Sequence, residues 1–164
     1  MKWVMVMVLG WLTIGSPAMA QVRMMDNGFK IKPAPSLVLK SLNKGTISLS
    51  KYKGKVIILN YFATWCPPCR REFPDLIALQ KAYPHQVQVV ALSLDDTVDP
   101  VRSFIKSANF PVVWVGDDRS ALVGPIRGIP TTYVIDSHFV LAYMKSGYVT
   151  SDELKQLVTR FSAR

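Results

Sequence analysis

The chain is poor in cysteine, with only Cys66 and Cys69 among its 164 residues. Neither thiol has a partner elsewhere in the chain, so any sulfur chemistry is confined to Trp65-Cys66-Pro67-Pro68-Cys69. Cysteines at this spacing can reach each other around one helical turn and close a disulfide. A bridge across so small a loop removes little chain entropy and contributes little stability. The spacing therefore favours a redox-active dithiol over a structural disulfide.

Histidine is also scarce, which argues against a metal site. His85 and His138 stand in turn-like segments without ligand spacing, and one CxxC pair supplies only two ligands. Covalent haem attachment needs histidine after the second cysteine, where Arg70 stands. We therefore expect no cofactor and no bound metal. A copper- or haem-handling binding module is the alternative from another functional class.

No apolar run is long enough to cross a bilayer as a helix. The longest one at the N-terminus, residues 3–14, is short of the ~20 residues that are needed. It follows Lys2 and precedes the small residues of Ala18-Met19-Ala20. This pattern predicts a signal peptide over residues 1–20 and a periplasmic or otherwise extracytoplasmic mature chain. An uncleaved N-terminal membrane anchor is the alternative.

Acidic residues are rare in the segment that follows. Between Gln21 and Asn60 the only acid is Asp26, against eight basic residues. This imbalance is compatible with an acidic partner or an anionic membrane surface, but a solvated lysine face is the favoured interpretation. No interleaved aromatic residues accompany the lysines, so nucleic acid is not expected as a partner.

The rest of the chain predicts one α/β domain. Residues 21–35 are interpreted as a linker and residues 36–164 as the domain. The expected strands are a β-hairpin over 37–49 and single strands over 56–62, 87–94, 111–115, 131–135 and 139–144. Helices are expected over 67–83 and 119–123, and two more are expected to begin at an Asp99 N-cap and at a Thr150–Glu153 capping box. The continuous apolar strands indicate a sheet that is buried on both faces, with the hairpin at one edge.

The dithiol follows the apolar strand 56–62 and begins a helix. A cysteine at a helix N-terminus has its thiolate stabilised by free N–H groups and the helix dipole, so Cys66 is the expected nucleophile. Cys69, one turn further, is expected to be more buried and to act as the resolving thiol. Pro67 and Pro68 have no N–H, which leaves essentially the Cys69 amide as a donor to the Cys66 sulfur. A less stabilised thiolate favours a reductant over a strong oxidant.

A second loop is a candidate for substrate binding. Gly128-Ile129-Pro130-Thr131-Thr132 precedes a predicted strand. A cis proline at this position would present the Ile129 backbone beside the cysteines as an edge for an extended substrate. An ordinary trans proline at the start of a strand is the alternative.

These motifs together resemble the thioredoxin superfamily, and more closely its TlpA/ResA-type exported thiol–disulfide oxidoreductases. The resemblance rests on Trp65 to Cys69, Glu72-Phe73-Pro74, Gly128 to Thr131 and the residues from Lys53 to Cys66, and it covers about Ala34 to the C-terminus. It implies a thioredoxin-like fold with an N-terminal β-hairpin and an extra helix and strand at 98–115. It also implies that Pro130 is cis. A membrane thiol protein of the DsbD/CcdA type is implied as electron donor.

The resemblance also suggests roles for two polar residues. Asn60 stands where cytoplasmic thioredoxins have a buried Asp, and a neutral amide cannot serve as a proton acceptor. Glu72 matches an acid of the ResA-like members and is the candidate for proton transfer or pKa modulation. A surface glutamate that the helix dipole stabilises is the alternative for Glu72.

The sequence thus predicts a monomeric, exported reductant of protein disulfides, for example the haem-binding cysteines of apocytochrome c. A general disulfide reductase or isomerase, or an oxidant, is the alternative. The residues expected to act are, for catalysis, Cys66, Cys69 and Glu72 and, for substrate binding, Trp65, Pro67, Pro68, Ile129 and Pro130.

Overall fold

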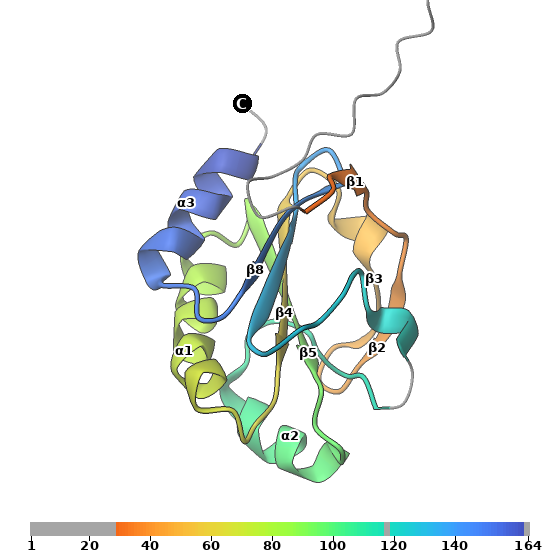
Figure 1. Ribbon diagram of the computed structural model, residues 1–164, viewed down its shortest axis with the longest axis vertical. Coiled ribbons are helices and arrows are strands. Elements are labelled where there is room, and N and C mark those ends of the chain that lie inside the picture. The colour runs from red at the N-terminus through yellow and green to blue at the C-terminus, as the bar shows by residue number, and fades with distance from the viewer. Residues whose placement is uncertain (1–28, 117–118, 163–164) are drawn as a thin grey trace, which may run out of the picture.

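The computed structural model describes residues 29–116 and 119–162, which form one mixed sheet with helices packed on it (Figure 1). The strands are β1 (Lys32–Pro33), β2 (Val38–Ser41), β3 (Gly45–Ser48), β4 (Val56–Phe62), β5 (Val87–Ser93), β6 (Val112–Trp114), β7 (Thr131–Ile135) and β8 (Val140–Ser146). The α-helices are α1 (Pro67–Ala82), α2 (Val98–Phe104) and α3 (Ser151–Phe161), and the 3₁₀ turns are η1 (Leu49–Tyr52), η2 (Ile105–Ser107) and η3 (Arg119–Ala121). Within these ranges no helix combines the length and apolar character needed to span a membrane. The predicted signal peptide 1–20 lies outside the described residues.

Strand β4 lies inside a sheet whose strand order is β1-β8-β7-β4-β5-β6-β2-β3. It pairs in parallel with β5 and antiparallel with β7. All seven of its residues are buried, as expected for a strand that is covered on both faces. The predicted α/β class is confirmed, and so is the N-terminal β2–β3 hairpin at one end of the sheet.

Alternate residues of β4 belong to two different cores, because successive side chains of a strand point to opposite faces. Ile58 and Phe62 pack on the side of α1, α2 and α3, while Ile57 and Tyr61 pack on the other side. In Figure 1, α1 and α3 lie side by side along the sheet, and the two helices are in contact. The alternation places Asn60 on the helix side, with Ile58 and Phe62.

The segment interpreted as a linker is partly folded into the domain. β1 pairs antiparallel with β8, and the N–H of Ala34 donates to the carbonyl oxygen of Phe139 at 3.0 Å. Phe29 and Ala34 are buried. The packed part of the chain therefore begins before residue 36, because the short β1 extends the sheet beyond β8. The linker residues before 29 lie outside the described residues.

The helix after β5 begins earlier than predicted. Its N-cap is Thr97, whose backbone is extended, and Asp99 lies in the first turn. Pro100 is tolerated there because the first N–H groups of a helix have no partner within it. α2 ends at Phe104 and continues as η2, and the helix predicted over 119–123 is the single turn η3.

The last helix begins at the predicted capping box. The Thr150 hydroxyl accepts a hydrogen bond from the Glu153 N–H at 3.2 Å, and the Glu153 carboxylate accepts one from the Thr150 N–H at 2.8 Å. Leu154, Leu157 and Val158 of α3 are buried on the helix side of the sheet. Because α3 contacts α1, this helix supports the element that carries the dithiol.

Candidate active site

The dithiol lies where β4 ends and α1 begins. Cys66 is the N-cap residue of α1 and forms a disulfide with Cys69, with the two Cα atoms 5.3 Å apart. The cysteines are 3% and 2% exposed, so the greater burial expected for Cys69 is not found. Trp65 is 67% exposed and Pro67 is exposed as well, whereas Pro68 is half-buried. A partner molecule therefore meets Trp65 and Pro67 when it approaches the disulfide.

The Cys66 sulfur has a sparse set of backbone donors. An N-cap side chain accepts from the N–H of the second or third helical residue. The third is Cys69, whose N–H donates to Cys66 Sγ at 3.4 Å. The second is Pro68, which has no N–H. Among the described residues, Cys69 thus supplies the one N–H that is hydrogen-bonded to this sulfur.

The Ile129–Pro130 loop lies beside the same sulfur. The carbonyl oxygen of Ile129 is 3.7 Å from Cys66 Sγ, and the Ile129–Pro130 peptide bond is cis, which confirms the geometry that the resemblance implied. The loop is fixed behind Pro130 by the N–H of Gly147, which donates to the Pro130 carbonyl at 2.7 Å. Ile129 is half-buried and Pro130 is buried. The structure therefore brings Trp65, Cys66 and Ile129 to one end of the sheet.

Glu72 is fully buried, so the alternative of a surface glutamate is wrong. Residues three and four apart share a helix face, and α1 places Glu72 on the face that buries Cys69 and Leu76. Its Oε1 atom accepts from Asn60 Nδ2 at 3.2 Å and from Thr132 Oγ1 at 3.4 Å. Glu72 therefore belongs to a buried polar cluster behind the dithiol.

Burial raises the pKa of Glu72 from 4.5 to about 7. The main cause is desolvation, which penalises the charged form, and the negative charge of Asp75 adds to the rise. The Val149 amide, the Thr132 hydroxyl and Lys145 favour the charged form and limit the shift. Among the described residues no hydrogen bond reaches the buried Oε2 atom, although the Val149 amide is near. Near neutral pH, Glu72 is thus a group that can accept and return a proton.

Two residues of the site, Thr132 and Asp95, were not among the site residues predicted from the sequence. Thr132 is the partner of Asn60 in the β4–β7 register, and this pairing places its hydroxyl on Glu72. The period-two alternation that puts Asn60 on the helix side was the available signal, once β4 and β7 are known to be neighbours. Asp95, which holds the turn before Cys66, lies in a loop that no sequence pattern marked.

No group of three or more His, Cys, Asp and Glu residues that could hold a metal ion is present within 29–116 and 119–162. His85 and His138 are exposed. The site thus consists of the sulfur pair, the buried acid and the polar groups around them.

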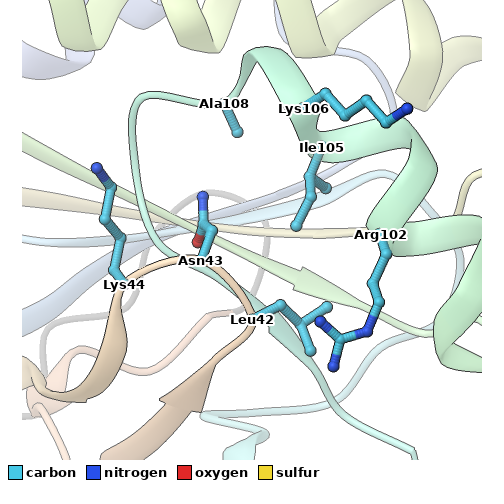
Figure 2. A pocket seen from close by; sticks show the side chains of 7 residues that line it. All are labelled: Leu42, Asn43, Lys44, Arg102, Ile105, Lys106 and Ala108. Carbon is cyan, nitrogen blue, oxygen red and sulfur yellow. The ribbon is translucent and has the colours of Figure 1, made fainter.

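One surface hollow lies elsewhere, between the 42–44 turn and the α2–η2 segment (Figure 2). Its volume is about 260 Å³. Figure 2 shows Lys44 and Lys106 extending in different directions at its rim. None of its lining residues belongs to the dithiol turn or to the Ile129–Pro130 loop. The hollow is therefore separate from the redox site.

Comparison with known proteins identifies the family. The AhpC/TSA family model matches residues 31–144. The chain belongs to this family. It is 35% identical over 120 residues to thiol-disulfide oxidoreductase ResA of Bacillus subtilis, covering 71% of this chain and 67% of that one. It is also 35% identical over 130 residues to the thioredoxin-like protein YneN of Bacillus subtilis, covering 75% of each.

A solved structure of a similar protein shows the same fold as this member of the AhpC/TSA family. The thioredoxin-family thiol:disulfide interchange protein from Chlorobium tepidum TLS superposes with a TM-score of 0.72 at 29% identity, covering 79% of this chain and 95% of that one. The predicted thioredoxin-like fold, the ResA-like assignment and the thiol–disulfide oxidoreductase activity are confirmed. Such an enzyme exchanges electrons with other dithiols and disulfides.

Proposed function

We propose that the protein is an exported reductant of protein disulfides, in which Cys66 attacks the substrate and Cys69 resolves the mixed disulfide. The observation that carries the redox direction is the donor set of Cys66 Sγ, in which Cys69 N–H is the hydrogen-bonded amide and Pro68 contributes none. A thiolate with few donors is poorly stabilised, so the reduced form gives up its electrons more readily.

The proposed cycle begins with the dithiol form. The Cys66 thiolate attacks one sulfur of a substrate disulfide, whose other sulfur leaves as a thiolate and takes a proton from solvent. The Cys69 thiol then passes its proton to the Glu72 carboxylate and attacks Cys66 Sγ, which releases the second substrate sulfur as a thiolate. Two electrons have moved to the substrate, and the protein ends as the Cys66–Cys69 disulfide. Reduction by an external dithiol restores the starting form.

We place the substrate along Trp65, Pro67, Pro68, Ile129 and Pro130. Trp65 supplies an exposed apolar surface beside Cys66, and the Ile129 backbone lies 3.7 Å from its sulfur. An extended substrate segment could hydrogen-bond to this backbone as strands pair at a sheet edge. The Cys66 sulfur would then face the substrate disulfide.

Export is proposed from the signal-peptide pattern of residues 1–20 and from the resemblance to exported oxidoreductases. In an oxidising compartment the dithiol needs an outside source of electrons, for which we propose a membrane thiol protein of the DsbD/CcdA type. The cysteines of apocytochrome c are the proposed substrate, and the protein is proposed to act as a monomer. Cell fractionation and mass spectrometry of the native protein should find an extracytoplasmic chain that begins at Gln21. A chain that keeps residues 1–20 would support the anchored alternative instead.

The reduction potential tests the proposed direction. Equilibration with glutathione should give a potential well below that of a strong oxidant, which lies at ~−120 mV. A value near that limit would remove the basis for a reductant, while leaving the oxidoreductase activity itself intact.

Restoring one amide should make the pair more oxidising. In Pro68→Ala the second helical residue gains an N–H that can donate to Cys66 Sγ. Hydrogen bonds to charged groups contribute ~1.5–3 kcal/mol, and ~30 mV corresponds to ~1.4 kcal/mol for a two-electron couple. We therefore expect the potential to rise by about 30–60 mV. Pro74→Ala, which adds an N–H to α1 away from Cys66, is the matched control and should shift it little. Equal shifts in both variants would contradict the donor argument.

A further inference from the structure

In the turn between β4 and α1, the N–H, the hydroxyl and the carbonyl group of Thr64 all form hydrogen bonds. The Thr64 N–H lies 3.0 and 3.1 Å from the two carboxylate oxygens of Asp95. Its hydroxyl donates to Asp95 Oδ1 at 2.5 Å. Its carbonyl oxygen accepts from Arg70 Nη1 at 3.2 Å. Thr64 directly precedes Trp65 and Cys66, so these contacts fix the approach of the chain to the nucleophile.

Asp95 is itself buried, at 4% exposure, and anchored from behind. Its carboxylate also accepts from Ser93 Oγ at 2.7 Å, and its carbonyl oxygen accepts from Trp114 Nε1 at 2.7 Å. The ion pairs among the described residues do not include Asp95. Because the groups that face the carboxylate all donate, an acid is the side chain that fits. An asparagine would turn an NH₂ group toward one of these donors.

We propose that Asp95 is a positioning residue, which fixes the Thr64 turn so that Trp65 is presented beside Cys66 for protein substrates. Trp65 is a large apolar side chain that is mostly exposed, and the fixed turn sets the position of its backbone relative to the Cys66 sulfur. Binding to a surface that is already ordered avoids the entropy cost of ordering it. The inference rests on the proposed substrate contact with the exposed Trp65 surface but is independent of the redox direction.

The same contacts assign a task to the segment between β5 and β6. Asp95 follows β5, and Trp114, which holds the Asp95 carbonyl, lies in β6. α2 lies between them and is tied to the dithiol helix, because the Arg70 guanidinium stacks over the Phe104 ring with its carbon 5.7 Å from the centroid. The segment from Asp95 to β6 thus supports the active-site turn through Asp95 and supports α1 through Phe104.

The experiment compares two substrates of the reduced protein. For Asp95→Asn we expect the second-order rate constant for insulin disulfides to fall about tenfold, since the loosened Trp65 turn must then be ordered when the protein substrate binds. For the small disulfide dithiobis(nitrobenzoate), which does not need the Trp65 surface, the rate constant should change less than about twofold. Asp136→Asn is the matched control: it makes the same substitution at an aspartate that accepts from the N–H groups of His138 and Val140 in the β7–β8 turn, away from the dithiol. It should leave both rate constants unchanged.

The outcomes separate the positioning role of Asp95 from the proposed substrate contact with Trp65. If Trp65→Ala slows insulin reduction and a folded Asp95→Asn does not, the positioning role of Asp95 is wrong and the substrate contact with Trp65 is retained. If Asp95→Asn slows both substrates equally, Asp95 has a general structural role and the inference also fails. If Trp65→Ala leaves insulin reduction unchanged, the proposed substrate contact with Trp65 is wrong, and the inference fails with it. Should Asp95→Asn not fold, Thr64→Val removes the hydroxyl contact and Thr64→Ser retains it, so only the valine variant should be selectively slow with insulin.

Discussion

Replacement of Cys66 by alanine should lower the rate of disulfide reduction by at least about a thousandfold, since loss of a covalent nucleophile is among the largest single-residue effects in catalysis. Replacement of Cys69 by alanine should also stop turnover, but it should leave a mixed disulfide between Cys66 and the substrate. Both effects follow from the position of Cys66 as the N-cap of α1, where its sulfur accepts a hydrogen bond from the Cys69 N–H. Mass spectrometry under non-reducing conditions measures the trapped complex.

Burial does not distinguish the two sulfurs, because both cysteines are almost fully covered. The order of attack is instead assigned by what surrounds each one. Cys66 lies between exposed Trp65 and Pro67 and faces the Ile129 carbonyl, whereas Cys69 lies one turn inside α1. The two single variants are therefore controls for each other. Accumulation of a mixed disulfide in Cys66→Ala, or its absence in Cys69→Ala, would reverse the assignment.

The parts of this molecule that depend on local patterns could be predicted from the sequence. The apolar run of β4 and the Thr150–Glu153 capping box fix their elements from neighbouring residues alone, and both are found where expected. The dithiol needs only these local features, because its two thiols are one turn apart. The boundaries of α2 depend on finer competition between Thr97 and Asp99 for the N-cap, and there the prediction was wrong.

The polar surroundings of the dithiol could not be predicted in the same way. The contact of Asn60 with Thr132 joins residues that are far apart in the chain, and it depends on β7 lying next to β4. The burial of Glu72 was easier to predict from the sequence, since Cys69 and Leu76 mark the buried face of its helix. Asp95 gave no signal, because an aspartate in a loop after a strand is usually solvated. Long-range pairing, rather than local pattern, thus determines what surrounds the sulfur atoms.

Glu72→Gln should change how the stability of the oxidised protein depends on pH. The pKa of Glu72 is raised from 4.5 to about 7 on folding, so the native state binds more protons than the unfolded state between these values. The contribution of Glu72 to the free energy of unfolding should therefore be fully present below about pH 4.5 and should be lost as the pH rises through about 7, a loss of about 3 kcal/mol. Glutamine cannot ionise, so this loss should be absent from Glu72→Gln. Urea unfolding at pH 5 and pH 8 measures the difference.

The control is Asp152→Asn, which removes an exposed carboxylate of α3 and should keep the wild-type pH dependence. If Glu72→Gln also keeps it, Glu72 does not take up its proton on folding. The wild-type loss of stability at alkaline pH would then have another source.

The same substitution should slow the step that Glu72 is proposed to assist. In a preformed mixed disulfide on Cys66, release of the substrate requires Cys69 to lose its proton, and the wild-type rate should rise with pH through about 7 as Glu72 ionises. Glu72→Gln should lose this rise and release substrate about 10²-fold more slowly at neutral pH, the low end of the usual general-base contribution. The attack by Cys66 that precedes it should change far less, because it needs no proton from Cys69. A variant that slows both steps equally would place Glu72 in the support of α1 rather than in proton transfer, and rapid acid quenching of each step separates these outcomes.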